Sequence, residues 1–67
     1  MKINVIVNGE ARELDEGTTL RQLLEQLSLS PDKVAVEWNR RLARAERLDQ
    51  PLKAGDAIEI VTVVGGG

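Results

Sequence analysis

The chain has 67 residues, a net charge of −2, and neither cysteine nor histidine. A chain of this length forms one domain with a small core and has no room for a deep cleft. Without cysteine there is no disulfide framework, thiolate metal site or thiol nucleophile, and without histidine the usual general base is missing. We therefore expect no catalytic residues, no resident metal and no activity as an independent enzyme.

The charges are nearly balanced, with nine basic residues against eleven acidic ones. This balance produces no field that predicts binding to nucleic acid or to a membrane. No apolar run is long enough to span a bilayer, and no charged segment precedes an apolar one as in a secretory signal. We expect a cytoplasmic chain that is unprocessed from Met1.

The first element predicted is a β-hairpin. Apolar and polar residues alternate over 2–7, which is typical of a strand with one apolar face. The dipeptide Asn8-Gly9 tolerates the positive φ angles of a type I′ turn, so residues 10–14 should form the return strand. The core-facing residues of the first strand are Ile3, Val5 and Val7.

A single helix follows the hairpin. Thr18 or Thr19 can cap its first turn, and Thr19 with Gln22 fits a capping box. Pro31 cannot continue a helix and sets its far limit. Leucines recur at the spacing of one helix face, at Leu20, Leu23, Leu24 and Leu27.

The second half of the chain predicts three more strands. Residues 34–38 alternate up to Trp38, whose side chain we expect in the core or at its rim rather than in a binding site. Asn39-Arg40 is a turn, and residues 41–43 form a short strand. Residues 44–50 fit no single pattern. After a turn at 53–56, in which Asp56 can accept hydrogen bonds from backbone amides, residues 57–64 form an apolar last strand.

These elements predict an α+β fold in which one main helix covers one face of a mixed sheet of four to five strands. The first and last strands are the most apolar and should lie side by side in the centre of the sheet, with the other strands outside. This order is typical of the β-grasp, or ubiquitin-like, roll. We assign residues 1–64 to this domain and residues 65–67 to a flexible tail.

Three glycines, Gly65, Gly66 and Gly67, follow the last strand directly. Glycine is slim and permissive, so such a tail can enter a narrow channel in another protein and present a terminal carboxylate there. This is the geometry required of a carrier whose own C-terminus is the reacting group. The alternative is a frayed end or a cloning scar.

The whole chain resembles the ThiS/MoaD family of sulfur carrier proteins, and most closely its ThiS branch. The residues that carry the resemblance are Asn8-Gly9, Thr19-Leu20, Leu23-Leu24, Val34-Ala35-Val36, Asn39, Leu52, Gly55-Asp56 and Val64-Gly65-Gly66-Gly67. Two features depart from the family pattern. Arg40 follows Asn39 where the family often has glycine, which argues against a tight turn there, and Gly65 adds a third glycine to the usual two.

The resemblance implies that an E1-like, ThiF-like adenylyltransferase activates the carboxylate of Gly67 with ATP and magnesium. A sulfur donor such as a cysteine desulfurase then converts the adenylate to a thiocarboxylate. In the ThiS branch the sulfur goes to a ThiG-like thiazole synthase for the thiazole ring of thiamine. The chain would be a carrier substrate that binds no cofactor itself, with Gly66 and Gly65 needed in the tail.

Several functions stay open on the sequence alone. A sulfur carrier could serve molybdopterin synthesis, tRNA thiolation or amino-acid sulfur delivery instead of thiamine. A ubiquitin-like modifier would form isopeptide bonds through Gly67. A plain interaction module would have a passive tail.

Strict alternation in the first and last strands places Ile6, Val61 and Val63 on the face opposite the helix. An apolar patch there would be a docking surface for the activating enzyme or the acceptor, unless loops cover it. Arg40 and Arg41 are a second candidate for partner binding, although charged runs are commonly just solvated.

Overall fold

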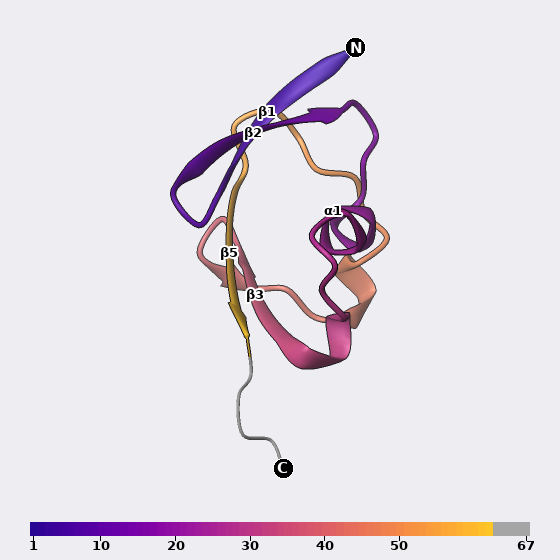
Figure 1. The fold of residues 1–67 in the computed structure, drawn as a ribbon, viewed down its shortest axis with the longest axis vertical. Coiled ribbons are helices and arrows are strands. Elements are labelled where there is room, and N and C mark those ends of the chain that lie inside the picture. Colours follow the sequence, from indigo (N-terminus) through magenta and orange to yellow (C-terminus); the bar gives the residue numbers. More distant parts are fainter. Residues whose placement is uncertain (63–67) are drawn as a thin grey trace.

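The computed structural model describes residues 1–62, which form a five-stranded mixed sheet with one α-helix packed on one face (Figure 1). The strand order across the sheet is β2-β1-β5-β3-β4. The elements in chain order are β1 (Lys2–Val7), β2 (Glu10–Asp15), α1 (Leu20–Gln26), the 3₁₀ turn η1 (Pro31–Lys33), β3 (Val34–Trp38), β4 (Arg41–Leu42), the 3₁₀ turn η2 (Ala45–Arg47) and β5 (Ala57–Thr62).

The last strand lies in the centre of the sheet, as predicted. Strand β5 runs parallel to β1, where Ile6 pairs with Ala57, and antiparallel to β3. Strand β2 pairs antiparallel with β1, and β4 pairs antiparallel with β3. The two most apolar strands are therefore neighbours, and the predicted α+β roll of the β-grasp type is confirmed.

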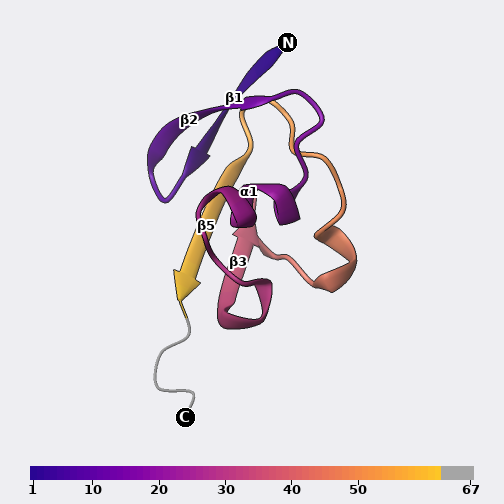
Figure 2. The same ribbon diagram turned by 45° about the vertical axis from the view of Figure 1, so that its right-hand side comes forward.

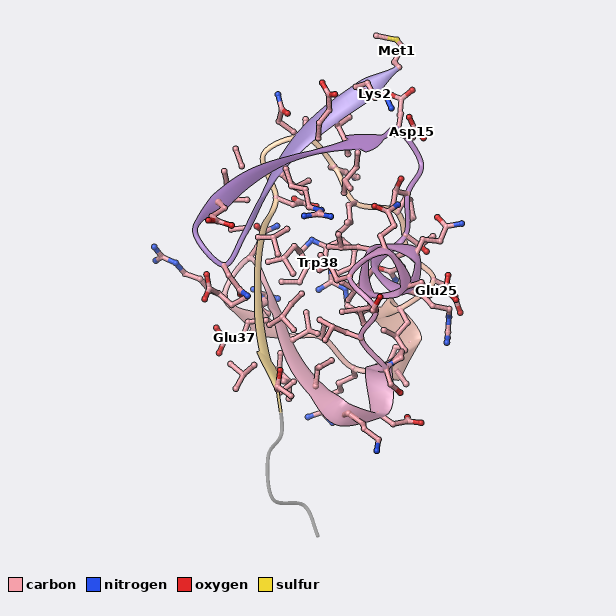
Figure 3. All side chains as sticks on the ribbon, viewed as in Figure 1. Met1, Lys2, Asp15, Glu25, Glu37 and Trp38 are labelled. Carbon is pink, nitrogen blue, oxygen red and sulfur yellow. The ribbon has the colours of Figure 1, made fainter. Side chains whose placement is uncertain are left out.

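The core lies between α1 and one face of the sheet. Thr19 caps the helix with the predicted capping box, since its hydroxyl accepts from Gln22 N and the Gln22 side chain accepts from Thr19 N. Leu20, Leu23 and Leu24 are fully buried, as are Val5 of β1 and Ile58 of β5. Trp38 is also in the core, with 4% of its surface exposed, and Figure 3 shows it between the sheet and the helix.

Replacing either Leu23 or Leu24 with alanine should cost about 2–5 kcal/mol of unfolding free energy, because the substitution leaves a cavity in the core that residues 1–62 form. A chain of this size holds on the order of 5 kcal/mol in total, so either variant should be largely unfolded or melt far earlier. Urea unfolding followed by circular dichroism measures the change. Gln26→Ala, at an exposed position of the same helix, is the control and should behave like the parent; equal stability of all three variants would contradict the core assignment.

The turn between β3 and β4 differs from the prediction. Asn39 and Arg40 both adopt positive φ angles, 53° and 71°, and the strands pair directly beside them, with Trp38 opposite Arg41. This is the tight two-residue hairpin that the missing glycine argued against. Arg40 accepts the left-handed conformation because the pairing on either side of the turn leaves no other path for the chain.

Arg40→Gly should therefore raise the unfolding free energy by about 0.5–1 kcal/mol, since glycine adopts a positive φ without strain. Asn39→Gly is the matched comparison at the other turn position. It should lower stability, because the Asn39 side chain makes two hydrogen bonds that glycine cannot replace. Denaturant unfolding followed by the fluorescence of Trp38 measures both, and a destabilised Arg40→Gly variant would show that the arginine side chain itself supports the fold.

The remaining differences are small. Strand β2 extends to Asp15, β4 ends at Leu42, and the segment without a clear pattern contains η2. Residues 63–64 of the predicted last strand and the predicted tail at 65–67 lie outside the described residues. Within residues 1–62, no helix has the length and apolar character needed to cross a membrane.

Candidate functional site

Strand β5 leads directly to the predicted reacting end of the chain. The pairing of β5 with its neighbouring strands therefore determines the position from which residues 63–67 start. Five residue pairs join β5 to β3, from Trp38 with Ile58 to Val34 with Thr62. On its other side β5 pairs with β1 at Ala57 and Ile58. Figure 2 shows β5 pointing away from the end of the sheet at which the N-terminus lies. The departure point of residues 63–67 is thus fixed by a central strand.

The side chain of Asn8 extends the hold on β5 beyond the end of β1. Asn8 has a φ of 51° in the hairpin turn, and its Oδ1 accepts a hydrogen bond of 2.7 Å from the backbone amide of Ile60. Because β1 ends at Val7, it offers no backbone carbonyl to Ile60 N, and the side-chain oxygen of Asn8 accepts that hydrogen bond instead. The sequence indicated Asn8 only as a turn residue, because no local pattern links it to a residue 52 positions away.

Asp56 joins the β3–β4 turn to the start of β5. Its carboxylate accepts hydrogen bonds from Trp38 Nε1 at 2.9 Å, Asn39 Nδ2 at 3.0 Å and the backbone amide of Lys53 at 2.8 Å. Asn39 Oδ1 in turn accepts from the backbone amide of Ala57. Asp56 therefore holds its turn and caps backbone amides, as the sequence indicated.

The same contacts shift the titration of Asp56. Partial burial favours the neutral acid, but the hydrogen bonds from Asn39, Lys53 and Trp38 favour the carboxylate more, so the pKa of Asp56 lies below its ordinary value of 3.8. A carboxylate with a lowered pKa in the folded state stabilises the fold above its ordinary pKa. That contribution is lost as the pH falls through the folded-state pKa.

We therefore expect the stability gap between the parent and Asp56→Asn to be largest at neutral pH and to shrink below pH 3.8. Urea unfolding at a series of pH values, followed by Trp38 fluorescence, measures the gap. Asp32→Asn removes an exposed carboxylate that forms no ion pair among residues 1–62 and controls for loss of charge. A gap for Asp56→Asn that stays constant with pH would mean that ionisation of Asp56 does not contribute.

The structure shows where two of the three residues of the predicted apolar patch lie. Ile6 and Val61 lie on the sheet face opposite α1, with 38% and 64% of their surfaces exposed, and Val63 lies outside the described residues. Ile6 is level with Ala57, four residues before Val61 on β5, so the two side chains are about 13 Å apart along the strand. They share a face but do not form one continuous patch, because Glu59 lies between them.

Arg40 and Arg41 are exposed at the β3–β4 turn, near the start of β5. Strand β5 delivers the chain at its other end, so these arginines lie far from the departure point of the tail. The guanidinium of a neighbouring arginine, Arg47, is 4.0 Å from the centre of the Trp38 ring. Arg40 and Arg41 thus form an exposed hairpin tip, whereas Arg47 packs on the ring of the core residue Trp38.

Leu42 of β4 is an exposed apolar residue that the sequence analysis did not single out. It has 58% of its surface exposed and pairs with Glu37 of β3 on the face opposite α1. Figure 3 shows Glu37 on the side of the sheet away from the helix. The only sequence signal was its alternation with Arg41 and Ala43, which is too short to define a face.

Comparison with known proteins identifies the family. A model of the ThiS family matches residues 5–67, which is nearly the whole chain. The chain belongs to the ThiS family. The predicted family is therefore confirmed, and the match extends through the three C-terminal glycines, which lie beyond the described residues.

Individual members of the ThiS family and related chains agree. The sulfur carrier protein ThiS of Thermus thermophilus is 41% identical over 64 residues, covering 94% of this chain and 98% of the relative. The crystal structure of the thiamine biosynthesis protein ThiS from Geobacter metallireducens superimposes with a TM-score of 0.79 at 33% identity, covering 97% of this chain and all of that one. A thiazole synthase of Magnetococcus marinus is 43% identical over 68 residues, and this chain spans only 20% of its length.

Residues 1–62 of this family member present an exposed protein surface next to the end of β5. No three acidic side chains in that range are placed to hold a metal ion together. What the described residues supply is a rigidly held strand that ends next to an exposed sheet face. The predicted covalent residue Gly67, and Gly66 and Gly65 beside it, lie outside the described residues.

Proposed function

We propose that this chain carries sulfur as a thiocarboxylate on Gly67 and delivers it for the thiazole ring of thiamine. The observation that carries the proposal is the ThiS match over residues 5–67, which includes the glycine tail. Family membership confirms the predicted class of function, a sulfur carrier of thiamine biosynthesis. The identity of the reacting residue and the steps below are our proposal.

The chemistry follows from the poor reactivity of a carboxylate. An oxygen of the Gly67 carboxylate would attack the α-phosphorus of ATP and release pyrophosphate, which gives an acyl-adenylate with a good leaving group. A sulfur nucleophile would then displace AMP from the carboxyl carbon. Sulfide would give the thiocarboxylate directly, whereas the persulfide of a cysteine desulfurase would give an acyl disulfide, whose S–S bond a thiol reductant would then cleave to release the thiocarboxylate. The sulfur rides on that carbon, so the carrier needs no cysteine of its own, and ATP and magnesium are bound by the activating partner.

Two partners follow from this route. The first is an E1-like adenylyltransferase, which with a sulfur donor such as a cysteine desulfurase would load Gly67 in the cytoplasm. The second is a thiazole synthase, which would accept the sulfur. The second partnership is supported by the Magnetococcus thiazole synthase, which contains a segment similar to the whole of this chain. A carrier and its acceptor within one chain meet at high effective concentration.

Deleting Gly67, or replacing Gly66 with leucine, should abolish adenylation while leaving the fold intact. A side chain at Gly66 adds a Cβ next to the reacting carbon and narrows the backbone angles that a confined tail can use. ATP–pyrophosphate exchange by the cognate activating enzyme measures adenylation. Mass spectrometry of the product detects the replacement of an oxygen by a sulfur.

Gly65→Ala is the matched control and should retain most of the exchange activity, since residue 65 is further from the reacting carbon. Normal exchange by a variant lacking both Gly66 and Gly67 would overturn the proposal. Ladders of conjugates to other proteins, instead of a thiocarboxylate, would indicate a ubiquitin-like modifier.

A further inference from the structure

The length of chain after β5 restricts where a partner can bind. Thr62 is the last residue of β5, and five residues separate it from the end of Gly67. Five residues can extend at most about 17 Å. A protein that holds Gly67 at its reaction centre must therefore contact surface close to this end of β5.

One exposed surface near this end is the sheet face opposite α1. Val61 pairs with Ala35 of β3 there, and the next pair on the same face, two residues back, is Glu59 with Glu37. Leu42 of β4 lies beside the Glu37–Glu59 pair on the same face, because it pairs with Glu37. The surface thus consists of two exposed apolar side chains beside two carboxylates.

The pairing of Glu37 with Glu59 is unfavourable in the free chain. Like charges directly opposite each other on neighbouring strands repel and destabilise the pairing. Among residues 1–62, the ion pairs join Lys2 to Asp15 and Arg21 to Asp49, so neither glutamate of the pair is neutralised. A single cation placed between the two carboxylates would remove the repulsion and make two charge-assisted hydrogen bonds.

We propose that Glu37 and Glu59, flanked by Leu42 and Val61, are the docking surface for thiazole synthase, which places an arginine or lysine side chain between the two carboxylates. This inference rests on the proposed sulfur transfer, because the reach of the tail defines the surface. Thiazole synthase is the occupant because the thiazole synthase of Magnetococcus marinus contains a segment similar to this chain, covalently joined to the remaining four-fifths of its length. The apolar neighbours would exclude water from the ion pair and strengthen it.

The test is the double variant Glu37→Gln/Glu59→Gln in the full-length chain with its tail. Isothermal titration calorimetry with the cognate thiazole synthase should show affinity at least about tenfold weaker than that of the parent, because each charged contact to the cation is lost. The parent affinity should fall with added salt, and that of the variant should depend on salt much less. The variant should melt at the same temperature as the parent or higher, because the repulsion is gone.

The control is Glu16→Gln/Glu25→Gln, which has the same net charge as the test variant. Glu25 lies on the exposed face of α1, on the far side of the molecule from Glu37 (Figure 3), and Glu16 is an exposed residue of the connection between β2 and α1. This control should bind like the parent. If both double variants bound thiazole synthase equally weakly, net charge alone would explain the loss of affinity, and the proposed docking surface would be wrong.

Two further outcomes separate this inference from the proposed function. A test variant that binds thiazole synthase as tightly as the parent does would overturn the docking surface alone. The same holds if the variant only raises KM for the activating enzyme, because the surface then belongs to that enzyme. A parent chain that does not bind thiazole synthase at all would overturn the proposed acceptor and the surface together.

Discussion

The fold depends on one constraint, which is that a single seven-residue helix must bury the sheet. Helix α1 can cover only one face, so the chain concentrates its core there, in leucines of α1 and in alternate residues of β1 and β5. The other face has no such cover among the described residues. The burial of successive residues in the central strand β5 alternates accordingly. Ile58 is fully buried, whereas Glu59 beside it is exposed. The size of the chain thus produces both the fold and the open surface.

The small core is not the only contact that holds β5 in place. Polar side chains also form hydrogen bonds with its backbone. At the start of the strand, Asp56 and Asn39 connect the β3–β4 turn to Ala57. Further along, Asn8 accepts from the amide of Ile60, beyond the last residue of β1. Buried or shielded backbone groups need partners, and each of these side chains supplies one where the sheet does not. The strand that leads to the tail is consequently fixed over its described length.

The sequence predicted the parts of the fold that depend on local pattern. Alternation gave the central strands, and the leucine spacing with Thr19 and Gln22 gave the helix and its cap. The turn at Asn39-Arg40 was correctly predicted but its tight form was not, because local preference disfavours arginine at a positive φ and the pairing of β3 with β4 overrides that preference. The preferences of single residues could not predict this conformation, since the strain at Arg40 is offset by strand pairing between residues on both sides of the turn.

The docking face shows a second limit of sequence reasoning. Alternation alone placed Ile6 and Val61 on one face, but their separation depends on the register between strands, which no single segment encodes. Register also creates the pairing of Glu37 with Glu59, two residues that are unremarkable on their own strands. Once register is known, the face near the end of β5 is neither a plain apolar patch nor a solvated charged one. It is mixed, and mixed surfaces discriminate, because a partner must match both the apolar side chains and the charge. Such discrimination would suit the proposed carrier, which would have to be recognised both by an activating enzyme and by an acceptor through the same C-terminal residues.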